Sequence, residues 1–257
     1  MQLPDPRFPP AFTARGVKAP ENPRSAAIMG ATRGELRAAD IVWARRVDRA
    51  EFAVVFEPEL PFNKLSEVRL VLQTALIDCL GTLMPSQTAL QIAWPDRLYC
   101  NGAQYGQTEI IAPEQTDPSA HVDWCIGYIR VDLTRKLDGL EPGLVRDQTS
   151  LSEEDAGDLD RTQIIQSCSA HLLNAVHHWE SDGIRPFVDR WIGRVFGYGS
   201  VAEIANPVRS HDGTDGDVIV RGELIGVGDE LELIIKRASD DQVVTVQPPV
   251  TKRPVSP

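Results

Sequence analysis

Residues 90–111 read Leu-Gln-Ile-Ala-Trp-Pro-Asp-Arg-Leu-Tyr-Cys-Asn-Gly-Ala-Gln-Tyr-Gly-Gln-Thr-Glu-Ile-Ile. The pair Asn101-Gly102 accepts the positive φ angles of a type I′ turn, and β-forming residues lie on both sides of it. The stretch therefore predicts a two-stranded ribbon. Pro95 has no N–H to give to a neighbouring strand, so it marks a strand edge or a bend. Gly106 marks a point where the backbone can approach a ligand closely.

The composition is that of an ordinary globular protein. The 257 residues suit one large domain, alone or with a small appendage, and 42% of them are hydrophobic and 25% charged. The formal net charge of −11 argues against a nucleic-acid surface, because phosphates are held by clustered lysine and arginine. No apolar run approaches the roughly 20 residues that a membrane span needs.

The N-terminal residues have neither the basic nor the apolar part of a signal peptide. The cysteines Cys79, Cys100, Cys125 and Cys168 contain no Cys-x-x-Cys pair, so reduced thiols are the simplest interpretation. Asp212, Asp215 and Asp217 have calcium-like spacing but lack the glutamate and the full ligand count of a calcium loop, and the clustered carboxylates at 153–155 are more typical of a solvated loop. We therefore expect a cytoplasmic protein with no nucleic-acid partner, no membrane partner and no metal site.

Periodicity and capping residues predict the remaining elements. Helices are predicted at 23–32, 61–83, from an Asp160 cap with Gln163 onward, and from Pro186 to near Trp191. Strands are predicted at 40–44, 52–56 and 124–133. A proline-rich extended arm is expected over 1–22, a polar connector over 197–216, four short strands over 217–246, and a frayed tail over 251–257.

The 90–111 stretch resembles the core signature of biotin protein ligases and their lipoate-ligase relatives. The matching residues are Trp94, Pro95, Asp96, Leu98, Tyr99, Asn101, Gly102 and Gly106. Further matches to the family pattern lie in Leu159-Asp160-Arg161, in the run from Trp179 to Pro186, and at Trp191. The resemblance is greatest to a bacterial branch of biotin/lipoate ligase-like proteins.

The resemblance implies an α+β fold, with a mixed sheet and packed helices followed by a small C-terminal SH3-like β-barrel. The corresponding boundaries are an arm over 1–22, a ligase-like domain over 23–205, an SH3-like domain over 206–250 and a tail over 251–257.

Three departures from the family pattern concern its charged groups. Ala93 stands at the first lysine of the signature, Arg97 at its second acidic position, and Ala103 or Gln104 where the catalytic lysine belongs. The loop after residue 44 keeps arginines but has lost every glycine of the family's adenylate loop. Its arginines suit a phosphate or carboxylate, and a solvated hairpin tip is the alternative interpretation.

The resemblance assigns candidate site residues. The candidate ligand-binding residues are Trp94, Asp96, Asn101, Gly102, Tyr105, Gly106, Arg45, Arg46 and Arg49. Arg97 and Gln104 are the candidates for a catalytic group in place of the missing lysine. Trp94 is expected to wall an acyl pocket, whereas Tyr105 either packs on the ribbon or places its hydroxyl at a ligand mouth.

Two functions follow, and the sequence leaves both open. The first is a ligase that joins biotin, lipoate or a similar carboxylic acid to ATP, with or without magnesium, and passes the acyl group from the adenylate to a carrier-protein lysine. The alternative is a non-catalytic ligand-binding or carrier-docking protein that keeps the ligase fold. The missing lysine favours the alternative, and the retained Trp94-Pro95-Asp96 run favours the ligase. Either would act as a monomer or a homodimer.

Overall fold

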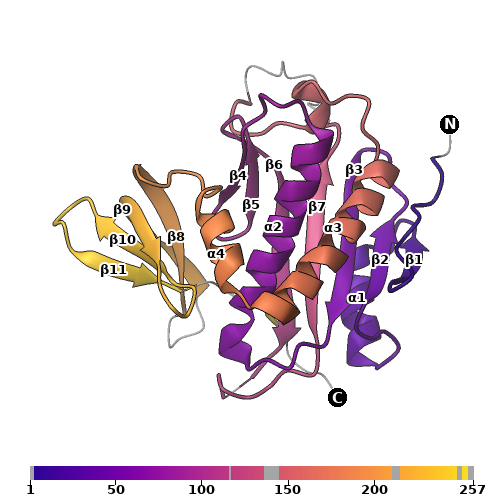
Figure 1. The fold of residues 1–257 in the computed structure, drawn as a ribbon, viewed down its shortest axis with the longest axis horizontal. Helices are drawn as coiled ribbons and strands as arrows, with labels where there is room; N and C mark the ends of the chain where they lie inside the picture. Colours follow the sequence, from indigo (N-terminus) through magenta and orange to yellow (C-terminus); the bar gives the residue numbers. More distant parts are fainter. Residues whose placement is uncertain (1–2, 116, 136–144, 210–214, 248–250, 254–257) are drawn as a thin grey trace.

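The computed structural model describes residues 3–115, 117–135, 145–209, 215–247 and 251–253. The chain forms a main sheet covered by helices and a smaller sheet beside it (Figure 1). The predicted α+β fold with a mixed main sheet and a small C-terminal β unit is confirmed.

The main sheet has the strand order β1-β2-β3-β7-β6-β5-β4. β1 pairs with β2 in parallel, and the other neighbours in this order pair antiparallel. The strands are β1 (Thr13–Val17), β2 (Asp40–Ala44), β3 (Arg49–Phe56), β4 (Leu90–Ala93), β5 (Arg97–Cys100), β6 (Ala103–Pro113) and β7 (Cys125–Asp132).

The 90–111 stretch forms three strands, so the prediction of a two-stranded ribbon was wrong. The chain reverses at Trp94-Pro95-Asp96, and β4 pairs back on β5. Pro95 cannot continue a ladder, which is the physical reason for the extra reversal. The turn at Asn101 (φ 50°) and Gly102 (φ 88°) has the two positive φ angles that the sequence predicted.

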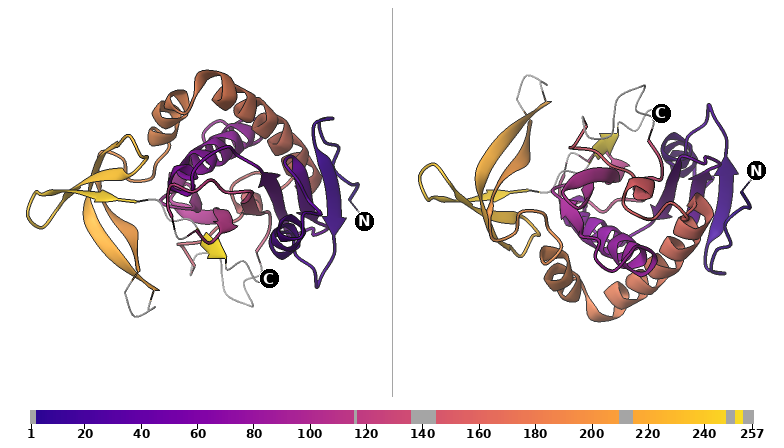
Figure 2. Two further views of the ribbon diagram at one scale, coloured as in Figure 1. Left: turned by 90° about the horizontal axis from the view of Figure 1, so that it is seen from below. Right: turned by 90° about the horizontal axis from the view of Figure 1, so that it is seen from above.

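Helices cover both faces of the main sheet. α2 (Ser66–Leu83), α3 (Arg161–Asp182) and α4 (Arg185–Ile192) cover one face, and α1 (Pro23–Thr32) covers the other (Figure 2). α2 is preceded by the 3-10 turn η1 (Phe62–Lys64) and is buried on nearly every side because α3 and α4 pack over it. Asp160 and Gln163 form the predicted capping box of α3, and Gly183 ends that helix at φ 75°.

The arm before α1 packs on the body. Asp5 makes a bidentate ion pair with Arg45, both distances being 2.7 Å. The Arg161 guanidinium donates to the carbonyls of Leu3 and Pro4, each at 3.3 Å. These contacts explain why a proline-rich segment without periodicity holds one extended path along β2 and α3.

The small sheet has the order β11-β10-β9-β8 and is antiparallel throughout. Its strands are β8 (Val201–Arg209), β9 (Asp215–Val227), β10 (Leu233–Arg237) and β11 (Val243–Val246). β8 lies in the region predicted as a connector, and β9 is one long strand, because the two pair along their length.

The small sheet shares its core with the main body. Buried Leu224, Leu233 and Ile235 belong to the same apolar cluster as Trp94 and the side chains of α2. Beyond that sheet, β12 (Thr251–Arg253) pairs in parallel with the end of β6, where a frayed tail was predicted. The backbone N–H and C=O groups along one edge of the end of β6 are free to pair, and β12 uses them to add a strand there.

Candidate functional site

The first cavity has a volume of about 500 Å³ and is rich in arginine. It lies where the β2–β3 loop meets β3, β6, β7 and the segment before the 3-10 turn η3 (Leu151–Glu153). We call it the arginine pocket. Its lining residues are Arg46, Asp48, Arg49, Gln104, Gly106, Gln107, Arg130, Asp132, Thr134, Arg135, Gln148 and Thr149.

Carboxylates hold the guanidinium groups of this pocket in place. Asp48 accepts two hydrogen bonds from Arg46, both at 2.8 Å, and two from Arg49, at 3.2 and 3.1 Å. Asp132 accepts two from Arg130, at 3.0 and 3.1 Å. The hydrogen bonds from Arg46, and then those from Arg49, lower the pKa of Asp48 to about 2. Asp48 is therefore ionised at neutral pH and fixes both arginines.

The lining of the pocket carries more positive than negative charge. Four arginines and two aspartates line it, which leaves two positive charges in excess. Arg135 is also paired, with Glu153 at 2.6 Å. A guanidinium has five N–H donors, and a bidentate carboxylate occupies two of them. Donors therefore remain for an anion in a chain whose formal net charge is −11.

Gln104 is one of the two positions, with Ala103, at which the sequence resemblance expects the lysine of the family. Its backbone N donates to the Asp147 carbonyl at 2.9 Å, and its carbonyl accepts from the Thr149 N at 2.8 Å. Its side-chain amide donates back to the Gly106 carbonyl at 3.3 Å. Of the two candidate positions, Gln104 lines the pocket and Ala103 does not.

Gly106 is needed for the packing of the sheet. A Cβ on Gly106 would lie 2.4 Å from the carbonyl oxygen of Arg130 on the neighbouring strand β7. The residue lines the arginine pocket as well, but the backbone that approaches it closely is that of the protein itself. The sequence predicted the close approach and attributed it to a ligand.

A second cavity, also of about 500 Å³, lies between the β4–β5 hairpin and the small sheet. We call it the tryptophan pocket. The Trp94 ring packs edge-on against Trp191, with 5.8 Å between ring centroids. Its lining residues are Arg69, Ala93, Trp94, Pro95, Asp96, Arg97, Tyr99, Glu109, Val195, Phe196, Ala202, Glu203, Ile204, Ile219, Leu224 and Leu233.

The predicted site is thus divided between two cavities. Arg46, Arg49, Gln104 and Gly106 line the arginine pocket, and Trp94, Asp96 and Arg97 line the tryptophan pocket. The cavities come next to each other at β5 and β6, because Arg97 and Gln107 are cross-strand partners and each lines one of them.

The other predicted site residues have structural roles. Arg45 is held away from the arginine pocket by Asp5 and lies over the Trp43 ring, 5.0 Å from its centroid. Tyr105 is fully buried in the core, where burial raises the pKa of its phenol, so its hydroxyl does not lie at a ligand mouth. The apolar surroundings of the ring, rather than ligand chemistry, decide its orientation.

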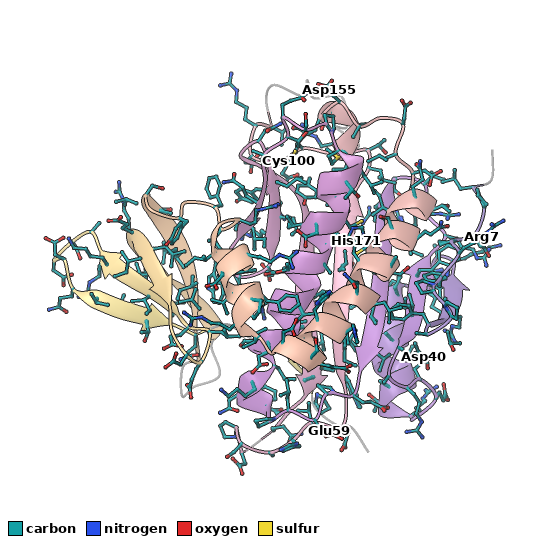
Figure 3. All side chains as sticks on the ribbon, in the orientation of Figure 1. Arg7, Asp40, Glu59, Cys100, Asp155 and His171 are labelled. Atoms are coloured by element: carbon teal, nitrogen blue, oxygen red, sulfur yellow. The ribbon has the colours of Figure 1, made fainter. Side chains whose placement is uncertain are left out.

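Asn101 and Gly102 form a turn whose side-chain contacts are internal. The Asn101 amide donates to Glu154 at 2.6 Å, and its carbonyl oxygen accepts from the Ala89 N at 3.0 Å. Figure 3 shows Cys100, next to this turn, and Asp155, next to Glu154, at the same end of the main sheet. The turn is therefore hydrogen-bonded to Glu154, in the segment that follows the pocket-lining residue Thr149 in the sequence.

Gln73 and Arg69 on α2 are residues that the sequence did not single out. The Gln73 amide nitrogen donates to the Pro95 carbonyl at 3.0 Å and to the Thr108 hydroxyl at 2.9 Å, and its oxygen accepts from the Trp191 indole at 2.8 Å. Arg69 donates to the same Pro95 carbonyl at 3.1 Å. A polar pair four residues apart inside an apolar helix was the available signal.

Burial lowers the pKa of Arg69 to about 10, while Asp96 and then Glu109 oppose that change. Glu109 in turn makes a bidentate pair with Arg24 of α1, at 2.6 and 2.7 Å. Buried polar side chains of α2, Gln73 and Arg69, thus hold the chain reversal at Trp94-Pro95-Asp96 in place.

The chain has the fold of biotin protein ligases. It resembles a biotin protein ligase-like protein of unknown function from Silicibacter sp. TM1040 with a TM-score of 0.76 and 23% identity, over 94% of this chain and 96% of that one. The apo biotin protein ligase from Aquifex aeolicus gives a TM-score of 0.69 and 13% identity, over 92% and 96%. The same enzyme with biotin and ATP gives 0.65 and 12%, over 91% and 95%. At these identities the likeness concerns the fold.

Residues 8–193 match the model of the biotin/lipoate A/B protein ligase family, and the chain belongs to that family. No curated protein sequence matches the chain. Within the part of the chain that the structure describes, no helix is long and apolar enough to cross a bilayer. The described residues also contain no group of three or more His, Cys, Asp or Glu side chains suited to a metal ion.

Proposed function

We propose that this chain binds a small carboxylic acid together with ATP in the arginine pocket and activates that acid slowly. Biotin and lipoate are the acids that the family suggests, and magnesium would accompany the ATP. The full reaction would join the acid to ATP, release pyrophosphate and pass the acyl group to a lysine of a carrier protein, in the cytoplasm.

One observation carries the binding half of this proposal. Four arginines meet around one pocket of a strongly acidic chain. Arg46 and Arg49 follow β2, where the resemblance places the adenylate loop of the family, and Arg130 and Arg135 come from β7 and the segment after it. Guanidinium groups bind carboxylates and phosphates with two parallel hydrogen bonds. An acid and ATP are both anionic, so bringing them together requires such fixed positive charge.

The slow step follows from Gln104. A neutral amide supports the developing charge less well than an ammonium, because charge-assisted hydrogen bonds are roughly twice as strong as neutral ones. Loss of one such group typically costs about 3–4 kcal/mol in the transition state, a rate factor of roughly 100 to 1,000. Binding without turnover, as a ligand sensor or a carrier-docking protein, is the second candidate function, and the same residue favours it.

Calorimetric titration with biotin, lipoate, octanoate and ATP, singly and in pairs, tests the binding. Pyrophosphate release in the same mixtures tests the chemistry. We expect measurable binding of an acid and slow release. Gln104→Lys should raise the release rate about tenfold or more, since it restores an ammonium in the pocket.

The matched control is Gln87→Lys, which adds the same charge at an exposed loop position outside the pocket. Rapid acylation of a biotin or lipoyl carrier domain by the unmodified chain would contradict slow activation. It would mean that arginines supply the missing charge. Failure of all the acids and ATP to bind would contradict the proposal itself.

A further inference from the structure

A third cavity, of about 170 Å³, lies between α2, α4 and β4. We call it the α4 pocket, since α4 packs against α2 on the side of the small sheet (Figure 1). Its apolar walls are the buried side chains of Ile77, Ile92 and Trp191. It shares no lining residue with the arginine pocket or the tryptophan pocket, so it is a separate site.

A buried hydroxyl also lines the α4 pocket. Thr74 is 5% exposed, and its hydroxyl oxygen is buried without a hydrogen-bond partner among the described residues. Burying a hydroxyl is unfavourable unless it is hydrogen-bonded. An oxygen atom of a ligand placed next to Thr74 would supply that hydrogen bond, because a hydroxyl can both donate and accept.

The remaining lining residues leave one positive charge in excess. Arg190 forms an ion pair with Asp78, and both line the pocket. Arg194 lines it as well and is exposed, and its guanidinium has no ion-pair partner in the described part of the chain. Its backbone is held in place, since its N donates to the Trp191 carbonyl at 2.9 Å and its carbonyl accepts from the Ile92 N at 2.8 Å. A guanidinium at this position suits a carboxylate, which it binds with two parallel hydrogen bonds.

We infer that the α4 pocket binds a short monocarboxylic acid that carries a second oxygen atom, as a hydroxy or keto acid does. The carboxylate pairs with Arg194, the carbon chain packs against Ile77, Ile92 and Trp191, and the second oxygen hydrogen-bonds to the Thr74 hydroxyl. A water molecule occupies about 30 Å³ in the liquid, so a cavity of about 170 Å³ holds roughly six non-hydrogen atoms. Biotin and ATP are larger than that.

A ligand in this pocket would touch the side chain that supports the reversal at Pro95. The Trp191 indole donates to Gln73 at 2.8 Å, and the Gln73 amide donates to the Pro95 carbonyl at 3.0 Å. The Trp191 ring also packs against Trp94, which lines the tryptophan pocket. The α4 pocket therefore lies one side chain away from the hairpin that carries the family signature, and the inference does not depend on what the arginine pocket binds.

The experiment compares small acids on the full chain by calorimetry at constant ionic strength. 3-Hydroxypropionate and butyrate have the same number of non-hydrogen atoms and differ by one hydroxyl in place of a methyl. Pyruvate represents the keto acids, and sulfate represents an anion without a carbon chain. We expect 3-hydroxypropionate or pyruvate to bind about fivefold more tightly than butyrate, the factor that one neutral hydrogen bond typically supplies. Sulfate should bind more weakly than either.

Two variants connect the binding to the pocket. Arg194→Gln should weaken the binding of the preferred acid about tenfold or more, the loss typical of a charged hydrogen-bonding group. Thr74→Val keeps the shape of the side chain and removes the hydroxyl, so it should abolish the preference over butyrate while the protein folds normally. Arg185→Gln is the matched control, since that arginine is 78% exposed on α4 outside the pocket.

Failure of all three carboxylic acids to bind would overturn the inference. Binding that is equally tight in Arg194→Gln would overturn it too, because the acid would then occupy another site. Equal binding of butyrate and the oxygen-bearing acids, or a preference that persists in Thr74→Val, would contradict the hydrogen bond to Thr74 and with it the class of acid. These results are independent of the proposed function, which is tested with biotin, lipoate, octanoate and ATP and should be unchanged in Arg194→Gln.

Discussion

Replacing Gln73 by leucine should destabilise the fold far more than the loss of one polar side chain on a helix normally does. Gln73 is fully buried, and its amide connects α2 with the Pro95 carbonyl, the Thr108 hydroxyl and the Trp191 indole. Leucine has a similar size and a high helix propensity. The change therefore removes hydrogen bonds while leaving little cavity and little loss of helix propensity.

The expected loss of stability follows from the hydrogen bonds that each partner of Gln73 keeps after the substitution. The Trp191 indole N–H is left buried without an acceptor among the described residues, which costs about 1–3 kcal/mol. Pro95 keeps the hydrogen bond from Arg69, and Thr108 keeps a weak contact with Asp96, so those two losses cost about 1 kcal/mol each. We expect a total of about 3–5 kcal/mol, which for a chain of this length corresponds to roughly 10 °C in melting temperature.

Urea unfolding, followed by fluorescence and circular dichroism, measures the difference in unfolding free energy between the wild type and Gln73→Leu, provided that the two proteins have the same m-value. The matched control is Gln87→Leu, the same substitution at an exposed position, for which we expect less than about 0.5 kcal/mol. A Gln73→Leu protein as stable as the control would refute the role assigned to the network. Trp191→Phe alone and combined with Gln73→Leu should give a coupling energy of about 1 kcal/mol or more.

Two further predictions concern other residues. The pKa of Asp48 falls from 3.8 to about 2 on folding, so its ionised form stabilises the native state above pH 4, and that stabilisation is lost as the pH falls towards 2. The wild type should therefore be more stable than Asp48→Asn by a constant free energy of unfolding near neutral pH, and this difference should shrink as the pH falls from 4 to 2. A difference that persists at pH 2 would contradict this. The Tyr105 hydroxyl is buried with no hydrogen-bond partner in the described chain, so Tyr105→Phe should be neutral or stabilising by up to about 1 kcal/mol in urea unfolding. A clear loss of stability would reveal a partner for that hydroxyl.

Carboxylates hold the guanidinium groups of the arginine pocket in fixed orientations. Arg46 and Arg49 share Asp48, and Arg130 is paired with Asp132 on the same strand. Each pair orients a guanidinium before any ligand arrives, so little further ordering is needed on binding.

Local signals in the sequence determined the parts of the fold that depend on neighbours in the chain. The Asn101-Gly102 turn and the Asp160–Gln163 capping box appear as predicted, because positive φ angles and unpaired helix N–H groups are satisfied within a few residues. The family signature in 90–111 correctly indicated the fold. The reversal at Pro95 was partly predicted, since proline announced a bend but not a third strand.

Tertiary structure alone decided which of the singled-out side chains meet. Arg45 and Arg46 are adjacent in sequence, yet Asp5 holds the first on the arm and Asp48 holds the second in the pocket. Tyr105 and Gln104 are also adjacent, and one is core while the other lines the cavity. Gln73 stands out locally as a polar residue in an apolar helix, but its partners lie 22, 35 and 118 positions away. Such contacts depend on how strands and helices pack across the whole chain, and no local pattern of residue types encodes that packing.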